Sequence, residues 1–236
     1  MKFPTFLVGG AVRDDLLGRD SKDLDFAVEA PSFGAMRAAV VADGGEVFTE
    51  NPEFFTLRAK DRTGSLTGQD NLTADFVLCR RDGESANGRH PDEVFAGSLL
   101  DDLARRDFTF NAMARPAGGG ELVDPFGGQA DLDAGVVRAV GVADERFRED
   151  ALRVLRAVRF AVVLGFAVED STATAMLDPE VVGLLASTSV ERKRDELAKA
   201  FRADTHRTME MLMGFPEALR RAMLPDGLRL EPTLKR

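Results

Sequence analysis

The sequence is poor in several of the residues that define particular classes of protein. It has a single cysteine, Cys79, two histidines, His90 and His206, and neither tryptophan nor tyrosine. One cysteine excludes an internal disulfide and fits a reducing compartment, so we expect a cytoplasmic protein. The histidines lie far apart in the sequence and have no cysteine neighbours, which argues against a structural zinc site.

Long apolar segments are also missing. No uninterrupted apolar run approaches the roughly 20 residues that a membrane-spanning helix needs. Residues 1–13 hold no long apolar stretch behind a basic start, so no signal peptide is visible. The 236 residues are 44% hydrophobic and 30% charged, which is typical of a folded globular protein with one large domain or two small ones. We therefore expect no membrane association.

Positive charge is in deficit, since the net charge is −9. Proteins that bind nucleic acids without selectivity are usually basic, so this balance argues against that class. It leaves a nucleic-acid enzyme possible, because a local basic face can act within an acidic protein. Lysines are few and arginines are many, and arginine suits bidentate contacts with phosphates and base edges.

The pattern of apolar and turn residues divides the chain into two parts. The first part, residues 1–137, is predicted to be a mixed α/β (α+β) unit, and the second, residues 138–236, a helical unit. The predicted strands are 6–10, 24–29, 46–49, 54–60 and 72–80, with a hairpin of 111–115 and 121–124 across a glycine run. The predicted helices are 11–17, 31–42, a segment from Asp144 onward, 180–185, 190–201 and 205–224. Polar loops are predicted over 62–71 and 81–92.

The first candidate site is the pair Gly9-Gly10, at the junction of a predicted strand and a predicted helix. Glycines let a ligand approach the backbone closely, and free amides at a helix start attract phosphate. Arg13 lies in the first helical turn, where its guanidinium reaches the same anion. Taken alone, most such glycine pairs are simple turns, so the phosphate hypothesis needs the support of a second motif.

An acidic pair, Asp23 and Asp25, lies on the next predicted strand. Residues two apart on a strand share a face, so the carboxylates converge while Leu24 faces the core. Two like charges held together are unfavourable without a cation, and paired metal ions about 3.5–4 Å apart are their usual partner in phosphoryl and nucleotidyl transfer. The alternative is a solvated acidic strand end. The preceding phosphate-type turn favours the metal hypothesis.

The order of these motifs resembles that of class II CCA-adding enzymes and bacterial poly(A) polymerases. The similar blocks are Leu7–Arg19 with Lys22–Phe26, Asp102–Ala114, Asp124–Leu132 with Val137-Arg138, Phe147–Ala161 with Leu164–Phe166, and Ser189–Arg192 with Glu196-Leu197. The resemblance implies a nucleotidyltransferase head of mixed β-sheet and helices. An all-α neck and an abbreviated body are expected to follow it.

The resemblance also assigns roles in the head. The family's catalytic carboxylates, which bind Mg²⁺, fall on Asp23 and Asp25, and its third acidic position falls on Asp75, which is otherwise an exposed strand residue. The nucleotide's phosphates are expected at Gly9, Gly10, Arg13 and Arg106. For Arg106 the alternative is a surface ion-pair cluster of residues 105–107 at a strand start.

The neck is expected to choose the base. Asp150 and Arg153 are three apart on a predicted helix and so share a face. Cytosine and adenine present an amino donor beside a ring-nitrogen acceptor, which a carboxylate and a guanidinium complement, whereas guanine and uracil present the opposite order. The resemblance puts this selection on the two residues, with Arg156 and Arg159 continuing the row toward phosphate or the RNA end. The alternative is a charged outer face opposite an apolar stripe of Leu152, Leu155, Val158 and Val162.

The implied function is template-independent addition of C and A from CTP and ATP to an RNA 3′ end, above all the CCA end of tRNA. A poly(A) polymerase, or an enzyme adding only CC or only A, is an alternative with the same chemistry. A catalytically silent RNA-binding remnant is an alternative from another class, but the intact carboxylate pair and base-reading pair argue against it. Class II enzymes usually run beyond 236 residues. We therefore expect an absent tail; whether a second copy of the chain or a partner protein replaces it is left open by the sequence.

Overall fold

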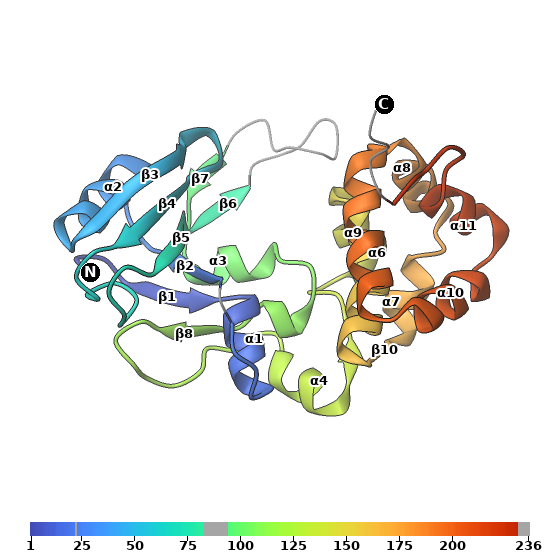
Figure 1. Cartoon of the computed structure of the whole chain (residues 1–236), viewed down its shortest axis with the longest axis horizontal. Coiled ribbons are helices and arrows are strands. Elements are labelled where there is room, and N and C mark those ends of the chain that lie inside the picture. Colours follow the sequence, from blue (N-terminus) through green and yellow to red (C-terminus); the bar gives the residue numbers. More distant parts are fainter. Residues whose placement is uncertain (22, 83–93, 231–236) are drawn as a thin grey trace, which may run out of the picture. The chain divides into compact units, whose positions relative to one another are not determined.

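The computed structural model describes residues 1–21, 23–82 and 94–230. The chain divides into two compact units, Met1–Ala130 and Asp131–Arg236 (Figure 1). The boundary predicted after residue 137 lies within the second of these units, at the end of a short strand. No helix in the described part of the chain is both long enough and apolar enough to cross a membrane.

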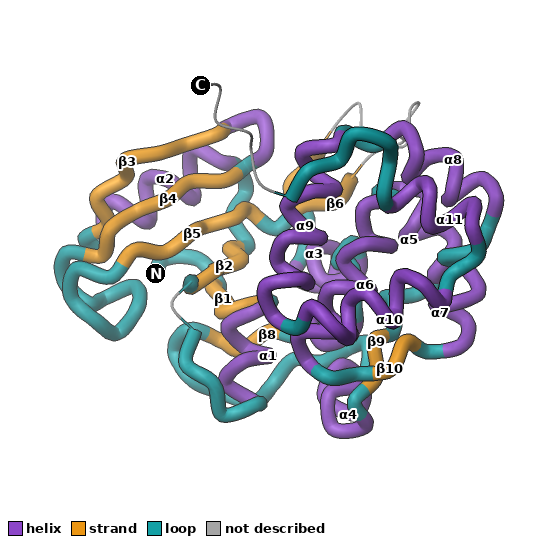
Figure 2. Tube along the Cα trace, turned by 45° about the vertical axis from the view of Figure 1, so that its right-hand side comes forward, coloured by secondary structure: helices purple, strands orange, loops and turns teal. Residues whose placement is uncertain are grey.

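The first unit is built on a six-stranded mixed sheet with the order β3-β4-β5-β2-β1-β8 (Figure 2). Its strands are β1 Thr5–Val8, β2 Leu24–Val28, β3 Gly45–Asn51, β4 Thr56–Asp61, β5 Thr73–Leu78 and β8 Ala114–Pro116. Strands β2 and β5 run parallel, and all other neighbours in this sheet are antiparallel. The mixed sheet confirms the fold class predicted from the sequence.

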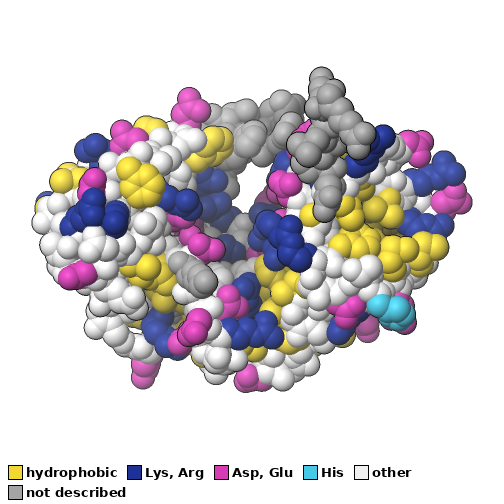
Figure 3. All heavy atoms as spheres, in the orientation of Figure 1, with side chains coloured by type: hydrophobic (Ala, Val, Ile, Leu, Met, Phe, Trp, Pro, Cys, Tyr) yellow, Lys and Arg dark blue, Asp and Glu magenta, His cyan; other side chains and the backbone are white. Residues whose placement is uncertain are grey.

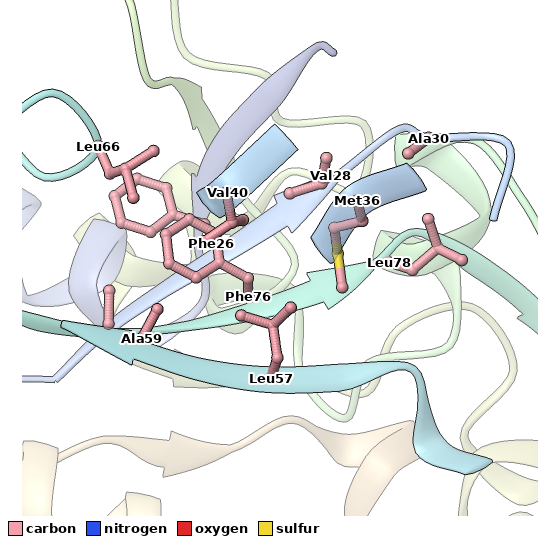
Figure 4. Packing of buried hydrophobic residues seen from close by; sticks show 11 residues of the cluster. Phe26, Val28, Ala30, Met36, Val40, Leu57, Ala59, Leu66, Phe76 and Leu78 are labelled. Atoms are coloured by element: carbon pink, nitrogen blue, oxygen red, sulfur yellow. The ribbon is translucent and has the colours of Figure 1, made fainter. Parts of the chain in front are cut away.

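One face of this sheet forms the core of the first unit. In β5, Ala74, Phe76 and Leu78 are buried while the residues between them are not, which is the two-residue period of a strand with one covered face. Helix α2 (Phe33–Ala42) covers this face, and its Met36 and Val40 are fully buried (Figure 4). The side chain of Ser32 accepts a hydrogen bond from the amide of Ala35 and so caps the start of α2.

The loop predicted over 62–71 is organised by a buried carboxylate. Asp61, at the end of β4, is 1% exposed. Its two oxygens accept hydrogen bonds from the amides of Thr63, Leu66 and Thr67 at 3.1, 2.9 and 2.7 Å. These bonds outweigh the cost of burial, which alone would raise the pKa of Asp61, and leave that pKa below its ordinary value. The loop is therefore held by backbone contacts to one side chain.

Within the described part of the first unit, α3 (Leu99–Ala104), β6 (Arg80–Asp82), β7 (Val94–Ala96) and a 3₁₀ turn at Pro52–Phe54 were not predicted. The loop predicted over 81–92 therefore begins inside β6, and its residues from 83 onward lie outside the described residues. The strand start predicted near 105–107 is wrong, because that segment ends α3 and leads into a 3₁₀ turn, Thr109–Asn111. The predicted hairpin reduces to one antiparallel bridge between Ala114 and Val123.

The second unit is helical. Its described helices are α5 Ala143–Glu149, α6 Leu152–Leu164, α7 Asp170–Ala175, α8 Pro179–Ser187, α9 Val190–Ala203, α10 Thr205–Gly214 and α11 Glu217–Met223. Helix α4 (Gly128–Ala134) crosses the boundary between the units, and β9 (Val136–Val137) pairs in parallel with β10 (Ala167–Val168). The apolar stripe predicted on α6, namely Leu152, Leu155, Val158 and Val162, is buried as expected.

The single helix predicted over 205–224 is wrong. Helix α10 ends at Gly214, Phe215 is extended, and α11 begins after Pro216. Proline has no amide hydrogen and clashes with the preceding turn, so it stops a helix and is tolerated only near the start of the next one. The periodicity of the apolar residues continues through this break, which is why the sequence pattern alone suggested one helix.

The packing of the core predicts a large effect of one truncation. Phe76 is 1% exposed, and its ring stacks on that of Phe26 with centroids 5.3 Å apart. Phe76→Ala should lower the free energy of unfolding by about 3–5 kcal/mol, because it removes the ring and leaves a cavity. Val41→Ala, at a half-exposed position on α2, should change it by less than about 0.5 kcal/mol. Urea denaturation of both variants measures this difference, and equal losses would contradict the packing described.

Candidate active site

A row of charged side chains crosses the open face of the sheet. Asp25 of β2 pairs directly with Asp75 of β5, and Asp75 pairs directly with Arg58 of β4. Directly paired residues project to the same face of a sheet, and the residues next to them in sequence project to the other. Since Phe26 and Phe76 lie in the core, the charged row lies on the opposite face.

Negative charge is concentrated at Asp25. Burial raises the pKa of Asp25 above its ordinary value, and the carboxylates of Asp75 and Asp23 add to the rise, while Arg106 and Arg58 oppose it. Asp23 lies just before β2 and is exposed, and its charge is close enough to raise the pKa of Asp25. The structure thus brings the predicted acidic pair together, in a place where the ionised form of Asp25 is disfavoured.

Arg58 was not anticipated from the sequence. Its Nε and Nη2 atoms donate hydrogen bonds to the two oxygens of Asp75, at 2.7 and 2.6 Å. This bidentate pair engages both oxygens of Asp75. In the described part of the chain, neither Asp23 nor Asp25 has a bidentate arginine of this kind. No single segment of sequence signals the contact, because the partners come from different strands.

The predicted phosphate-binding turn begins at Gly9, directly after β1. Its φ of +69° lies in the left-handed region that favours glycine. A Cβ atom at this position would lie 2.8 Å from Nη1 of Arg106, so a larger residue would displace that guanidinium. A Cβ atom at Gly10 would meet Nη2 of Arg13 at 3.5 Å, an ordinary contact. Gly9 is therefore the glycine of the pair that the geometry requires.

Two predicted phosphate ligands, Arg13 and Arg106, are oriented by the same residue. Nη1 of Arg13 donates to the side-chain oxygen of Asn111 at 2.8 Å, and Nη1 of Arg106 donates to its backbone oxygen at 3.3 Å. The side-chain amide nitrogen of Asn111 in turn donates a hydrogen bond to Asp107 at 3.0 Å. The structure therefore gathers Gly9 and both arginines into one basic group beside β1.

A second unanticipated residue, Asp102, holds Arg106. Asp102 is fully buried and accepts hydrogen bonds from Nε and Nη2 of Arg106, at 3.2 and 2.8 Å, and from Arg105. Burial alone would raise the pKa of Asp102, but the charges of Arg106 and Arg105 outweigh it and hold the pKa below its ordinary value. The spacing of Asp102 and Arg106, four apart, was the available signal in the sequence. The ion pairs of Arg105 and Arg106 are thus made with a buried residue outside the surface cluster predicted at 105–107, and they orient Arg106.

The predicted helical face shared by Asp150 and Arg153 is wrong. Helix α5 ends at Glu149, and Asp150 is extended, with φ −151° and ψ 98°. Its carboxylate accepts a hydrogen bond from the amide of Leu152 at 3.1 Å and pairs with Arg192 of α9 at 2.8 Å. Aspartate competes for nearby backbone amides and so favours helix ends over helix interiors.

The three predicted arginines of α6 all have acidic partners. Nη1 of Arg153 donates to Glu149 at 2.9 Å and so turns back toward α5. Arg156 and Arg159 pair with Glu196 of α9, at 3.7 and 2.5 Å. Glu196 is buried, so these pairs fix α6 against α9. Asp150 and Arg153 are therefore neighbours at the junction of two helices, each engaged by a different residue.

No cluster of three or more histidine, cysteine, aspartate or glutamate side chains suited to a metal ion occurs among the residues that the structure describes. The acidic pair Asp23 and Asp25 is the set that fits a divalent cation. Burial and the charges of Asp75 and Asp23 raise the pKa of Asp25, and a bound cation would oppose this rise.

Comparison with known proteins defines the class of the chain. The family described as Poly A polymerase head domain matches residues 5–138, and the chain belongs to that family. It is 42% identical over 199 residues to a CCA-adding enzyme of Lactiplantibacillus plantarum, an alignment that covers 84% of this chain and 45% of the relative. The chain thus spans about half the length of the curated relatives it matches.

Solved structures show the same similarity. One is the Bacillus stearothermophilus CCA-adding enzyme in complex with CTP, with a TM-score of 0.73 and 35% identity over 88% of this chain and 47% of that one. Another is a tRNA nucleotidyltransferase complexed with a primer tRNA and an incoming ATP analog, with a TM-score of 0.75 and 32% identity over 95% of this chain and 60% of that one.

The raised pKa of Asp25 predicts that this residue destabilises the fold at neutral pH. A carboxyl group whose folded-state pKa lies above its unfolded value stabilises the fold while protonated, and this contribution is lost as the pH rises through the folded pKa. Asp25→Asn should therefore raise the free energy of unfolding at pH 7. The gain should shrink toward acid pH.

Urea denaturation of the wild type and the variant, from pH 7 toward acid pH, measures the effect. Asp20→Asn, at an exposed position in the same unit, is the matched control and should change little. A variant no more stable than the wild type at pH 7 would show that Asp25 is not under electrostatic strain.

Proposed function

We propose that this chain transfers nucleotides from CTP and ATP to the 3′ end of an RNA without a template, completing the CCA end of tRNA. The observation that carries the proposal is the placement of the acidic pair Asp23 and Asp25 beside the basic group of Gly9, Arg13 and Arg106. This arrangement lies in the part of the chain that matches the head-domain family. The named relatives are CCA-adding enzymes, and one of their structures contains CTP.

In this reaction the RNA 3′-hydroxyl attacks the α-phosphate of the nucleotide, and pyrophosphate leaves. Asp23 and Asp25 would hold Mg²⁺, which when bound supplies Lewis-acid stabilisation of the phosphoryl oxygens. Arg13 and Arg106 would bind the β- and γ-phosphates and offset the charge that develops on the leaving group. Because Asn111 and Asp102 already orient these guanidiniums, little reorganisation is needed when the nucleotide binds.

Choice of the base is assigned to the helical unit. Asp150 would accept from the amino group of cytosine or adenine, and Arg153 would donate to the ring nitrogen. They act from the junction of α5 and α6 rather than from one helical face. Arg156 and Arg159 would contact phosphate or the RNA end, with guanidiniums that Glu196 already orients.

The proposal implies RNA, CTP and ATP as partners and action in the cytoplasm. The only cysteine, Cys79, is buried, and burial together with nearby carboxylates raises the pKa of its thiol, so it stays an unreactive thiol. The description of the matched family as a poly A polymerase head makes addition of A alone the second candidate output. Incubation with labelled CTP or ATP and a tRNA transcript lacking CCA distinguishes the outputs by the sequence of the product.

The first functional prediction concerns the acidic pair. Asp23→Ala should lower the rate of nucleotide incorporation at least about a hundredfold, the scale of losing one charge-stabilising group. The fold should stay intact, since the side chain is exposed. Asp20→Ala removes a nearby exposed carboxylate and should retain activity. Full activity of Asp23→Ala, or full wild-type activity in excess chelator, would refute the role of a metal held by this pair.

The second concerns base choice. Asp150→Ala should weaken the preference for CTP and ATP over UTP and GTP by roughly 1–3 kcal/mol, the scale of one good bidentate base contact. Arg192→Ala removes the ion-pair partner of Asp150 while leaving its carboxylate in place, and so should keep the preference. Competition among the four triphosphates measures it. If both variants lose the preference equally, Asp150 acts only by fixing α9.

A further inference from the structure

The open face of the sheet is hollowed next to Asp25. This cleft has a volume of about 460 Å³. Its lining residues are Asp25, Phe48, Thr49, Glu50, Asn51, Thr56, Leu57, Arg58, Asp75 and Val77. On the surface of this unit, single hydrophobic side chains lie among basic and acidic ones (Figure 3). Two of the lining residues, Phe48 and Arg58, bind neither the metal nor the triphosphate in the proposed reaction.

Phe48 is placed in the cleft by an irregularity of β3. Val47 pairs with Ala59 and Thr49 pairs with Arg58, so Phe48 is an extra residue that has no partner on β4 in the register of the described strands. A β-bulge of this kind bends the strand and re-aims the side chain at the extra position. Phe48 is 56% exposed and takes no part in the core. An aromatic ring is thus presented to solvent in the cleft that Asp25 and Asp75 also line.

Arg58 is presented differently. Its bidentate pair with Asp75 fixes the plane of the guanidinium, yet 51% of its side chain is exposed. A guanidinium has five donors, and Asp75 accepts from two atoms of it, so donors remain for a second anion. Arginine held in this way loses little conformational freedom when it binds a phosphate.

The order of the strands places the cleft and the phosphate-binding group on opposite sides of Asp25. The phosphate-binding group follows β1, on one side of Asp25, while the cleft lies over β5, β4 and β3, on the other side. In nucleotidyl transfer the attacking and leaving oxygens lie roughly in line across the phosphorus. With the leaving pyrophosphate on the β1 side, the attacking hydroxyl has to arrive from the side of the cleft.

We infer that this cleft binds the terminal nucleotide of the RNA being extended, with its base stacked on Phe48 and a backbone phosphate on Arg58. The inference rests on the proposed function and adds a binding site for the RNA end to it. Stacking on an aromatic ring tolerates every base, because each base has a π face. Such a platform suits an RNA end whose last base changes after each addition.

The test compares Michaelis constants for RNA and for nucleotide. Phe48→Ala should raise the KM for an acceptor-stem minihelix at least about fivefold, as expected for the loss of one stacked base. The KM for CTP should change by less than about twofold, since the nucleotide does not touch the ring. Phe48→Tyr keeps the ring and should restore the KM for RNA. Phe54→Ala is the matched control, because Phe54 is 42% exposed and does not line the cleft.

A binding measurement makes the inference independent of turnover. Fluorescence anisotropy with the same minihelix, labelled at its 5′ end, is performed in chelator without nucleotide. Arg58→Gln should weaken binding and lower the slope of log Kd against log salt concentration by about one, as for one lost phosphate contact. Phe48→Ala should weaken binding with an unchanged slope.

The outcomes separate this inference from the proposed function. If no nucleotide is transferred by any variant but Phe48→Ala and Arg58→Gln bind the minihelix more weakly, the proposed function fails and the RNA site stands. If transfer occurs but neither variant changes RNA binding or its KM, the inference is overturned. A rise in the KM for CTP instead of that for RNA would also overturn it, because the cleft would then hold the incoming nucleotide.

Discussion

The parallel pairing of β2 with β5 is the constraint on which the rest of the structure depends. The register that stacks Phe26 on Phe76 in the core also sets Asp25 beside Asp75 on the open face. A slip of one residue would exchange the two faces and place carboxylates in the core. Burial of the aromatic pair therefore supplies the force that holds two like charges side by side. This arrangement raises the pKa of Asp25, through burial and through the charge of Asp75.

The arginines near Asp25 oppose the rise in its pKa only in part, and each has its own polar partner. Arg58 is held by Asp75, Arg106 by Asp102, and Arg13 by Asn111. Each of these contacts fixes the direction of a guanidinium, and Arg13 is held in addition by Asp14. A net charge of −9 is compatible with binding a polyanion, because the binding surface depends on a few oriented guanidiniums and not on the charge of the whole chain.

The sequence predicted those features that depend on neighbours along the chain. The convergence of Asp23 and Asp25 follows from the period of a strand, and the strained position of Gly9 follows from the turn that it begins. Contacts between strands, such as that of Arg58 with Asp75, depend on a register that no single segment reveals. Asp150 was predicted to lie within a helix because the apolar periodicity continues from α5 into α6. It lies instead between the two helices, where its carboxylate accepts a hydrogen bond from the amide of Leu152 at the start of α6. Pro216 interrupts the helix predicted over 205–224, because proline has no amide hydrogen to continue the helix.

The central claim is that Asp25 must be ionised, against its surroundings, to hold a cation during transfer. The most direct test is the single-turnover rate of CMP incorporation as a function of pH at two Mg²⁺ concentrations. Since protons and metal compete for the same carboxylate, the rate should fall as the pH drops through a value above the ordinary 3.8 of aspartate, and more Mg²⁺ should move this midpoint to lower pH. A midpoint that does not move with Mg²⁺ would contradict the account.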